Sequence, residues 1–413
     1  MSTITASKHA DGRDSTYALW RLAAAVVLST IGGVGLWSVV VILPTIQAEF
    51  GVDRGSASIP YMVTMLGAAF GGIVMGRLAD RFGIRVPLLI GIYMLGFGYI
   101  AAACAATFWQ FTLAQALLIG AFGTSVTFGP LVADVSLWFV KRRGIAIAVV
   151  SSGNYLAGTV WPPILTYAIE TVGWRFAYMG IGAVCVLTML PLSLALRRRP
   201  VLDDVAPAHR TGSQPGGTAM SPALVQSLIV VAGFACCVAM AMPQVHIVAY
   251  CGDLGFAAAR GAEMLSLMLG FGVVSRLLSG VIADWIGGVK TLILGSTLQC
   301  LALLFYLPFD GLTSLYVVSA LFGLSQGGIV PSYALIVREY FPAREAGARI
   351  SLVLMATIIG MAAGGWMSGE IYDLTGSYQA AFLNGIAWNL LNMSIAFWLL
   401  MGYSNMRAKL AAA

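Results

Sequence analysis

The stretch GRLADRFG at residues 76–83 decides the fold, because a second copy, GVIADWIG, stands at residues 280–287. Asp284 of the second copy follows Asp80 of the first by 204 residues. The chain is therefore built from two repeated halves. The other landmarks that keep nearly this offset are EFGV at 49–52 with DLGF at 253–256, and WRFAYMGIGA from Trp174 with YQAAFLNGIA from Tyr378.

The composition indicates a membrane protein. Of the 413 residues, 59% are hydrophobic and 10% are charged, with a mean hydropathy of +0.88, whereas about 25% of the residues of a soluble globular protein are charged. Apolar stretches recur that match the ~20 helical residues needed to cross a bilayer. We predict an all-α integral membrane protein with about twelve transmembrane helices in two six-helix pseudo-repeats. The predicted spans are 20–46, 57–76, 86–106, 110–137, 144–168, 175–196, 225–250, 261–282, 290–308, 312–337, 347–369 and 379–402.

A polar segment separates the halves. The sequence RRRPVLDDVAPAHRTGSQPGGTAMSP, residues 197–222, is rich in proline, glycine and charge and lacks the apolar content of a packed core. Two halves joined by such a linker are typical of moving parts, although a repeat can also be a structural relic. The expected divisions are an N-terminal tail at 1–19, a six-helix bundle at 20–196, the linker at 197–222, a second bundle at 223–403 and a C-terminal tail at 404–413.

The positive charges predict the orientation of the chain. Lysine and arginine concentrate in alternate loops and at both termini, while the opposite loops hold only Arg54, Arg175 and Arg260, beside several acidic residues. By the positive-inside rule, both termini and the linker face the cytoplasm. We expect residence in a bacterial inner membrane. The net charge of +6 reflects this topology and gives no support to nucleic-acid binding.

The repeated motif also has a physical interpretation. Gly76 permits close helix packing, and Gly83 permits a tight turn. Asp80 stands at a helix end beside the basic Arg81 and Arg85. These residues therefore form a candidate gating motif, unless the charges only solvate a loop.

The motif resembles the loop signature of the major facilitator superfamily. The resemblance covers essentially the whole chain and implies the major facilitator fold, with a cytoplasmic charge network that stabilises the outward-open state. The first copy departs from the family pattern at Ile84, where a second basic residue is usual. The second copy keeps Gly280, Asp284 and Gly287 but has Trp285 in place of the arginine.

Other segments resemble one branch of that superfamily. WFVKRRGIAIAVVSSGNYLAG at 138–158 is similar to the loop and fifth helix of the monocarboxylate transporter and oxalate/formate antiporter branch. IGGVGLW at 31–37 looks like its first-helix signature without the leading acidic residue, and MPQVHIVAYCGDLG at 242–255 is similar to its seventh helix. This resemblance implies alternating-access transport of small organic anions, with an eighth-helix arginine that holds a carboxylate.

Arg276 is the candidate for that arginine. It lies within an apolar span and corresponds by the repeat to Gly72, so the shared scaffold does not require the charge. An arginine at membrane depth costs about 2.5–3.5 kcal/mol on insertion scales and usually faces a cavity, a partner or a permeant ion. Gly272 and Gly280, four residues to either side, clear one face of the helix, and the guanidinium fork suits a carboxylate. Alternatively, Arg276 snorkels toward the cytoplasm or pairs with a polar group of another helix.

The chain departs from the resembled branch in its other charges. Monocarboxylate transporters have an aspartate one turn before the arginine and a lysine in the first helix. Here Gly272 occupies the former position, and the first helix has no lysine after Arg21. A site with one buried cation suits a monoanion better than a dianion. The aspartate that usually carries the proton in that branch is therefore absent.

Further polar residues within the spans are weaker candidates. His246 is suited to proton exchange or to bonding a carboxylate, or it is a neutral histidine bonded to a backbone carbonyl. Asp134 is suited to carrying a proton, although pairing with the basic cluster 141–143 is favoured. Other side chains either line the substrate path or bridge helices. They are Asn154, Tyr155, Gln244, Gln326 and Tyr333.

The sequence thus predicts a secondary active or facilitated transporter of a small organic monoanion, with Arg276 as carboxylate anchor. Transport of the anion is coupled either to a proton or to a counter-anion, and both alternatives stay open. The alternatives are an exporter of drugs or other amphiphiles, in which Arg276 is structural, and a membrane sensor without transport. We expect a lipid-embedded monomer with no enzymatic activity, cofactor or metal, because the sequence has no nucleophile–base pair, phosphate loop or metal-ligand cluster.

Overall fold

The computed structural model describes residues 14–139, 143–198 and 221–411. Within these ranges the chain is helical and contains no strand. Twelve helical stretches are long and apolar enough to cross a membrane, which confirms the predicted fold class.

The helices of the first half precede the linker, and those of the second half follow it. The first half contains α1 (Thr16–Gly32), α2 (Val34–Phe50), α3 (Arg54–Phe82), α4 (Arg85–Ala103), α5 (Phe108–Leu113), the π-helix η2 (Ala114–Gly123), the 3₁₀-helix η3 (Thr124–Thr127), α6 (Gly129–Trp138), α7 (Arg143–Ser151), α8 (Gly153–Val172), α9 (Trp174–Ser193) and the 3₁₀-helix η4 (Leu194–Leu196). The second half contains α10 (Pro222–Asp253), α11 (Ala258–Ile286), α12 (Gly288–Phe305), α13 (Leu312–Gln326), α14 (Ile329–Tyr340), α15 (Ala343–Thr375) and α16 (Tyr378–Ala411).

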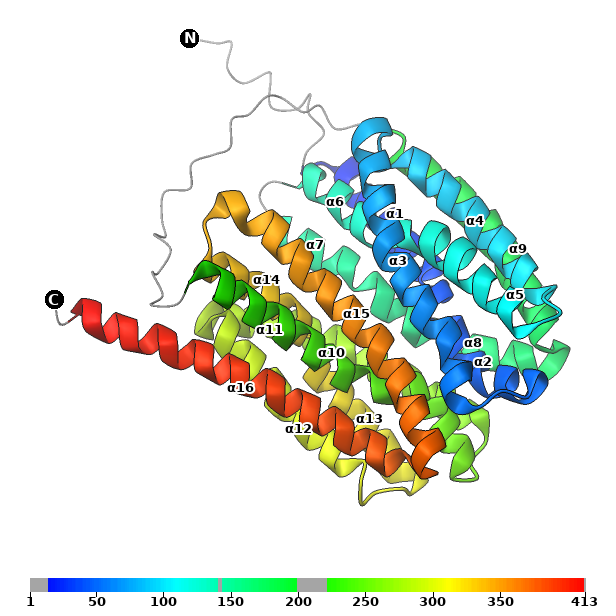
Figure 1. The fold of residues 1–413 in the computed structure, drawn as a ribbon. Coiled ribbons are helices and arrows are strands. Elements are labelled where there is room, and N and C mark those ends of the chain that lie inside the picture. The colour runs from blue at the N-terminus through cyan, green and yellow to red at the C-terminus, as the bar shows by residue number, and fades with distance from the viewer. Residues whose placement is uncertain (1–13, 140–142, 199–220, 412–413) are drawn as a thin grey trace, which may run out of the picture.

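Two helix pairs make most of the contact between the halves. In Figure 1 the blue and cyan helices of the first half lie on one side and the green to red helices of the second half on the other. Across this boundary α3 packs against α15, and α8 packs against α11. The pseudo-repeat is visible in the backbone as well: Gly83 and Gly287 end α3 and α11 with φ of 80° and 84°.

The terminal helices run further than the sequence predicts. The first begins at Thr16 rather than at position 20, because the Ser15 side chain accepts a bond from the Ala18 N–H at 3.3 Å and caps it. The last continues to Ala411, past the predicted end of the bundle at position 403. Most of the predicted N-terminal tail and linker lies outside the described residues.

Several spans are interrupted. The first span breaks at Gly33, where a Cβ atom would come within 2.6 Å of the Ala157 Cβ. The fourth span changes from α-helix to π-helix and then to a 3₁₀ turn before α6. The tenth breaks between α13 and α14 at Gly327 and Gly328. Such breaks are tolerated at membrane depth where other protein groups satisfy the freed backbone.

Close backbone packing holds α3 against η2. A Cβ atom on Gly71 would overlap the backbone carbonyl of Ala121, while one on Gly120 would lie 2.7 Å from the carbonyl oxygen of Thr64. Without a hydrophobic force between helices in lipid, small residues that allow such approach are a main source of association. This contact ties the second span to the fourth.

Gly71 and its neighbour Gly72 form a matched test of this packing. We expect Gly71→Ala to lower the free energy of unfolding by about 1–3 kcal/mol, because its methyl group would meet backbone that cannot move aside. Gly72→Ala should have no destabilising effect, since its nearest neighbour, the Ser125 carbonyl oxygen, is 3.9 Å away. Detergent titration of the purified variants measures both; equal stabilities would contradict the packing argument.

Candidate functional site

The two ends of the bundle differ in charge and are called the basic end and the acidic end. The basic end carries the turns at Gly83 and Gly287, the start of α1 and the end of α16. The acidic end carries the turns at Gly51 and Gly255.

Arg276 on α11 reaches across the boundary between the halves. Its Nη1 donates to the backbone carbonyl of Ser151 at 2.8 Å, and its Nε donates to that of Gly327 at 3.4 Å. The guanidinium carbon lies 4.3 Å from the ring centroid of Tyr155, a cation–π distance. Among the described residues, no carboxylate pairs with it. Two of its five N–H groups have acceptors, so donors remain for an anion.

Breaks in two neighbouring helices supply the carbonyl acceptors. Ser151 is the last residue of α7, and Gly327 directly follows α13. Pro331 stands four residues after Gly327 and has no N–H to donate to that carbonyl. The carboxyl ends of helices carry partial negative charge. Within the described part of the chain, this half-buried cation is therefore balanced by helix ends and not by an acidic side chain.

An amide pair adjoins the arginine. A Cβ atom on Gly272, one turn before Arg276, would lie 2.8 Å from the Tyr155 ring and 3.6 Å from the Nε2 of Gln326. The Oε1 of Gln326 accepts a short hydrogen bond from Gln244, but its Nε2 has no partner among the described residues, although the side chain is fully buried.

Asn154, next to Tyr155 on α8, faces the first span instead, where a Cβ atom on Gly33 would lie 3.7 Å from its Oδ1. Its backbone carbonyl receives a bond from the Trp37 indole at 3.1 Å, while its buried Oδ1 is unpaired within the described part of the chain. No contact between described residues joins the Asn154 side chain to Arg276. Arg276, Tyr155, Gln244 and Gln326 form one cluster, called the arginine site below.

The structure gives His246 and Tyr333 other partners. The Nε2–H of His246 donates to the Gly365 carbonyl at 2.7 Å, and its Nδ1 accepts from the Tyr378 hydroxyl at 2.9 Å, an arrangement that suits the neutral ring. The Tyr333 hydroxyl, 2.9 Å from the Ala232 carbonyl, also bonds Asn392 within the second half. Neither joins the arginine site.

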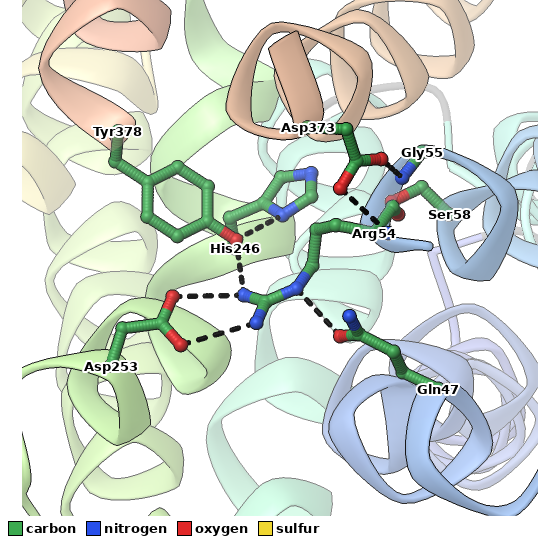
Figure 2. A network of polar contacts seen from close by, with 8 residues as sticks. All are labelled: Gln47, Arg54, Gly55, Ser58, His246, Asp253, Asp373 and Tyr378. Carbon is green, nitrogen blue, oxygen red and sulfur yellow. Dashed lines mark hydrogen bonds and ion pairs between the residues drawn. The ribbon is translucent and has the colours of Figure 1, made fainter. Parts of the chain in front are cut away.

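A second polar network links the halves at the acidic end (Figure 2). The Nη1 and Nη2 of Arg54 donate to the two carboxylate oxygens of Asp253 at 3.0 and 3.1 Å. Nη1 also donates to the Tyr378 hydroxyl at 2.7 Å, and Nε donates to Gln47 at 2.7 Å. Arg54 and Gln47 belong to the first half, while Asp253 and Tyr378 belong to the second.

A further carboxylate of the second half binds the backbone of α3. Asp373 accepts from the N–H groups of Arg54 and Gly55 at 3.0 and 2.5 Å. Asp53 caps the same helix from its own half, and the bonds it accepts from Ser56 lower the pKa of its carboxyl below the ordinary value. The sequence pattern predicts Arg54 only as a loop charge. Its isolation among acidic residues was the available signal.

The candidate gating motif at the basic end is exposed. Asp80, Arg81 and Arg85 face solvent, and none is ion-paired with another described residue. A Cβ atom added to Gly76, or to Gly280 in the second copy, would have no neighbour within 4 Å. The Arg276 contacts join the halves between this end and the acidic end.

Asp134 is paired with Arg21. The Nε and Nη2 of Arg21 donate to the two Asp134 oxygens at 2.8 and 2.7 Å, and both side chains are buried. The Trp138 ring centroid lies 4.7 Å from the guanidinium carbon, and the Arg198 carbonyl accepts a third bond. The expected partners at 141–142 lie outside the described residues, as does the side chain of Arg143. This clamp joins the first and fourth spans to the start of the linker.

A family model described as the Major Facilitator Superfamily matches residues 25–312 and 286–410. The chain belongs to this superfamily. As a major facilitator, it is a membrane transporter and not an enzyme.

Named relatives of this facilitator differ in their described cargo. Monocarboxylate transporter 13 of Bos taurus is 28% identical over 322 residues, which are 76% of this chain and 73% of the relative. Agnestins efflux protein AgnL12 of Paecilomyces divaricatus is 24% identical over 347 residues, or 82% and 77% of the two chains.

Solved structures share the fold of the facilitator. The nucleoside transporter NupG superposes with a TM-score of 0.71 at 14% identity, covering 94% of this chain and 99% of that one. A bacterial homologue of the lysosomal transporter Spinster, in an inward-facing and occupied conformation, superposes with a TM-score of 0.65 at 16% identity, covering 95% and 96%.

The Arg21–Asp134 clamp predicts a large loss of stability when one partner is removed. We expect Asp134→Asn to lower the free energy of unfolding by about 3–5 kcal/mol, because it leaves a buried guanidinium unpaired. Asp284→Asn, at an exposed carboxylate, is the control and should change little. Detergent titration measures both, and a stable Asp134→Asn protein would refute the clamp.

Proposed function

We propose that the protein is a secondary transporter that moves a small organic monoanion by alternating access, with Arg276 as the anchor for its carboxylate. One contrast carries the proposal. Arg21 and Arg54 each bind a carboxylate of the chain bidentately, whereas Arg276 contacts two backbone carbonyls and an aromatic ring. Among these three arginines, Arg276 keeps its charge available for a ligand.

The groups around Arg276 suit such a ligand. The remaining guanidinium N–H groups are positioned to bind a carboxylate, a geometry in which arginine gives two parallel charge-assisted bonds. The unpaired Nε2 of Gln326 offers another donor. With a single cation and no second basic side chain in the cluster, one negative charge is the better match.

In the proposed orientation, the basic end faces the cytoplasmic side of a bacterial inner membrane. The Arg54 network then closes the outer end, and the exposed motif around Asp80 belongs to a state open toward the inside. Because no carboxylate accompanies Arg276 among the described residues, we favour anion exchange or facilitated movement over obligatory proton symport.

The relative named as a monocarboxylate transporter supports this substrate class. The alternative is export of a larger amphiphile, and the relative named as an efflux protein favours it. The two differ in whether transport depends on the charge of Arg276.

The first test removes that charge. We expect Arg276→Gln to reduce uptake of labelled monocarboxylates such as lactate and benzoate into proteoliposomes about 100-fold, because two charge-assisted bonds are lost. Leu277→Ala, at the next and exposed residue, should transport like the parent protein.

Unchanged uptake by a folded Arg276→Gln protein would eliminate the anchor role. Transport of neutral or cationic amphiphiles, with no response to carboxylates, would replace the proposal with the export alternative.

The second test concerns the ring beneath the guanidinium. We expect Tyr155→Leu to weaken binding of the same monocarboxylates about 3- to 30-fold, because the cation–π contact that holds Arg276 in place is lost. Tyr155→Phe keeps the ring and should bind within about twofold of the parent protein. Ligand-induced thermal shifts of the purified variants report the affinities. Equal losses in both variants would contradict a role for the ring.

A further inference from the structure

The pseudo-repeat exposes a difference between the halves at the acidic end. The 204-residue offset pairs Glu49 with Asp253, Trp174 with Tyr378, and Arg175 with Gln379. The first two pairs keep an acid and an aromatic hydrogen-bond donor in both halves. The third replaces an arginine by a neutral amide.

In the first half, the acid Glu49 is paired with residues of its own half. Glu49 pairs with Arg175 at 2.6 Å and accepts a short hydrogen bond from the Trp174 indole. Both partners lie at the start of α9. The carboxylate is thus satisfied without any group from the second half.

In the second half, the matching acid lacks that arginine. Gln379 carries no charge, and Asp253 instead pairs at 3.0 Å with Arg54, the first residue of α3 in the other half. The position in α11 that corresponds to Arg54 is Ala258, so the pairing is not reciprocated. One cross-boundary ion pair therefore replaces an internal one.

We propose that the Arg54–Asp253 pair is a charge latch that holds the acidic end closed, and that Gln379 makes the latch possible by leaving Asp253 without an arginine of its own half. This rests on the alternating-access mechanism proposed above, since a latch has meaning only if the halves separate at this end.

The surroundings of Arg54 suit a latch. Its side chain is 9% exposed, and the rings of Tyr372 and Tyr378 lie 4.6 and 5.7 Å from its guanidinium carbon. Asp373 holds the same residue by its backbone N–H at 3.0 Å. Separation of the halves breaks all these contacts together, so the closed state is cooperative.

Two glycines of α15 allow the halves to approach closely at the same end, so a side chain at either position would oppose closure. A Cβ atom on Gly369 would lie 2.8 Å from the Arg54 carbonyl oxygen, and one on Gly365 would lie 2.9 Å from the Tyr61 ring. The latch therefore acts where α3 and α15 already meet at small residues. Charge and close packing stabilise the same arrangement.

The latch is tested by measuring the separation of the halves in the full chain without substrate. Spin labels on native Cys104, which is exposed while the other five cysteines are buried, and on an introduced Gly311→Cys report the distance across the acidic end in lipid nanodiscs. We expect Arg54→Gln and Asp253→Asn each to raise the ratio of long to short distances about tenfold.

The decisive variant adds a charge instead of removing one. Gln379→Arg combined with Asp253→Glu reproduces the Glu49–Arg175 pair in the second half, and we expect it to open the acidic end as far as Arg54→Gln does. Asp253→Glu alone should remain closed. The charge swap Arg54→Asp with Asp253→Arg should restore the short distance.

An unchanged distance distribution in Arg54→Gln and Asp253→Asn would overturn the latch. Opening in those variants without opening in the Gln379→Arg, Asp253→Glu protein would overturn the role of Gln379. Because no substrate is added, these outcomes are independent of whether Arg276 binds a monoanion.

Discussion

Charges and free backbone groups inside a membrane must find partners within the protein, and in this chain that requirement shapes the boundary between the halves. Arg276 extends from α11 to the ends of α7 and α13, where interrupted helices present carbonyls. Arg54 extends from α3 to Asp253. Each arginine contacts the opposite half, so the polar contacts that make burial tolerable also determine where the halves touch.

The fold was predictable from the sequence because its signals are repeated. The two copies around Asp80 and Asp284, the apolar spans and the midpoint linker all describe the same architecture, and the superfamily match agrees. The limits of the terminal helices were less predictable, since a single serine cap moves the start of α1. The breaks in the fourth and tenth spans depend on packing against other helices, which composition does not encode.

The arginine site was partly predictable. Arg276 was identifiable because its counterpart, Gly72, carries no charge, and Tyr155 and Gln326 were polar residues in neighbouring spans. Their convergence around Gly272 depends on three helices meeting and has no sequence signature. The Arg21 partner of Asp134 was not predictable for the same reason: nearness in sequence favoured residues 141–143, whose side chains lie outside the described part of the chain, whereas the fold brings Arg21 to it.

The acceptors of Arg276 have an evolutionary consequence. Ser151 and Gly327 contribute main-chain oxygens. Replacing an acidic side chain by a neutral one therefore cannot remove the acceptors that balance the charge of this arginine. Drift at position 151 is free so long as the helix still ends there, whereas position 327 tolerates only glycine because α11 approaches so closely. Searches for compensating residue pairs would therefore not detect the groups that surround Arg276.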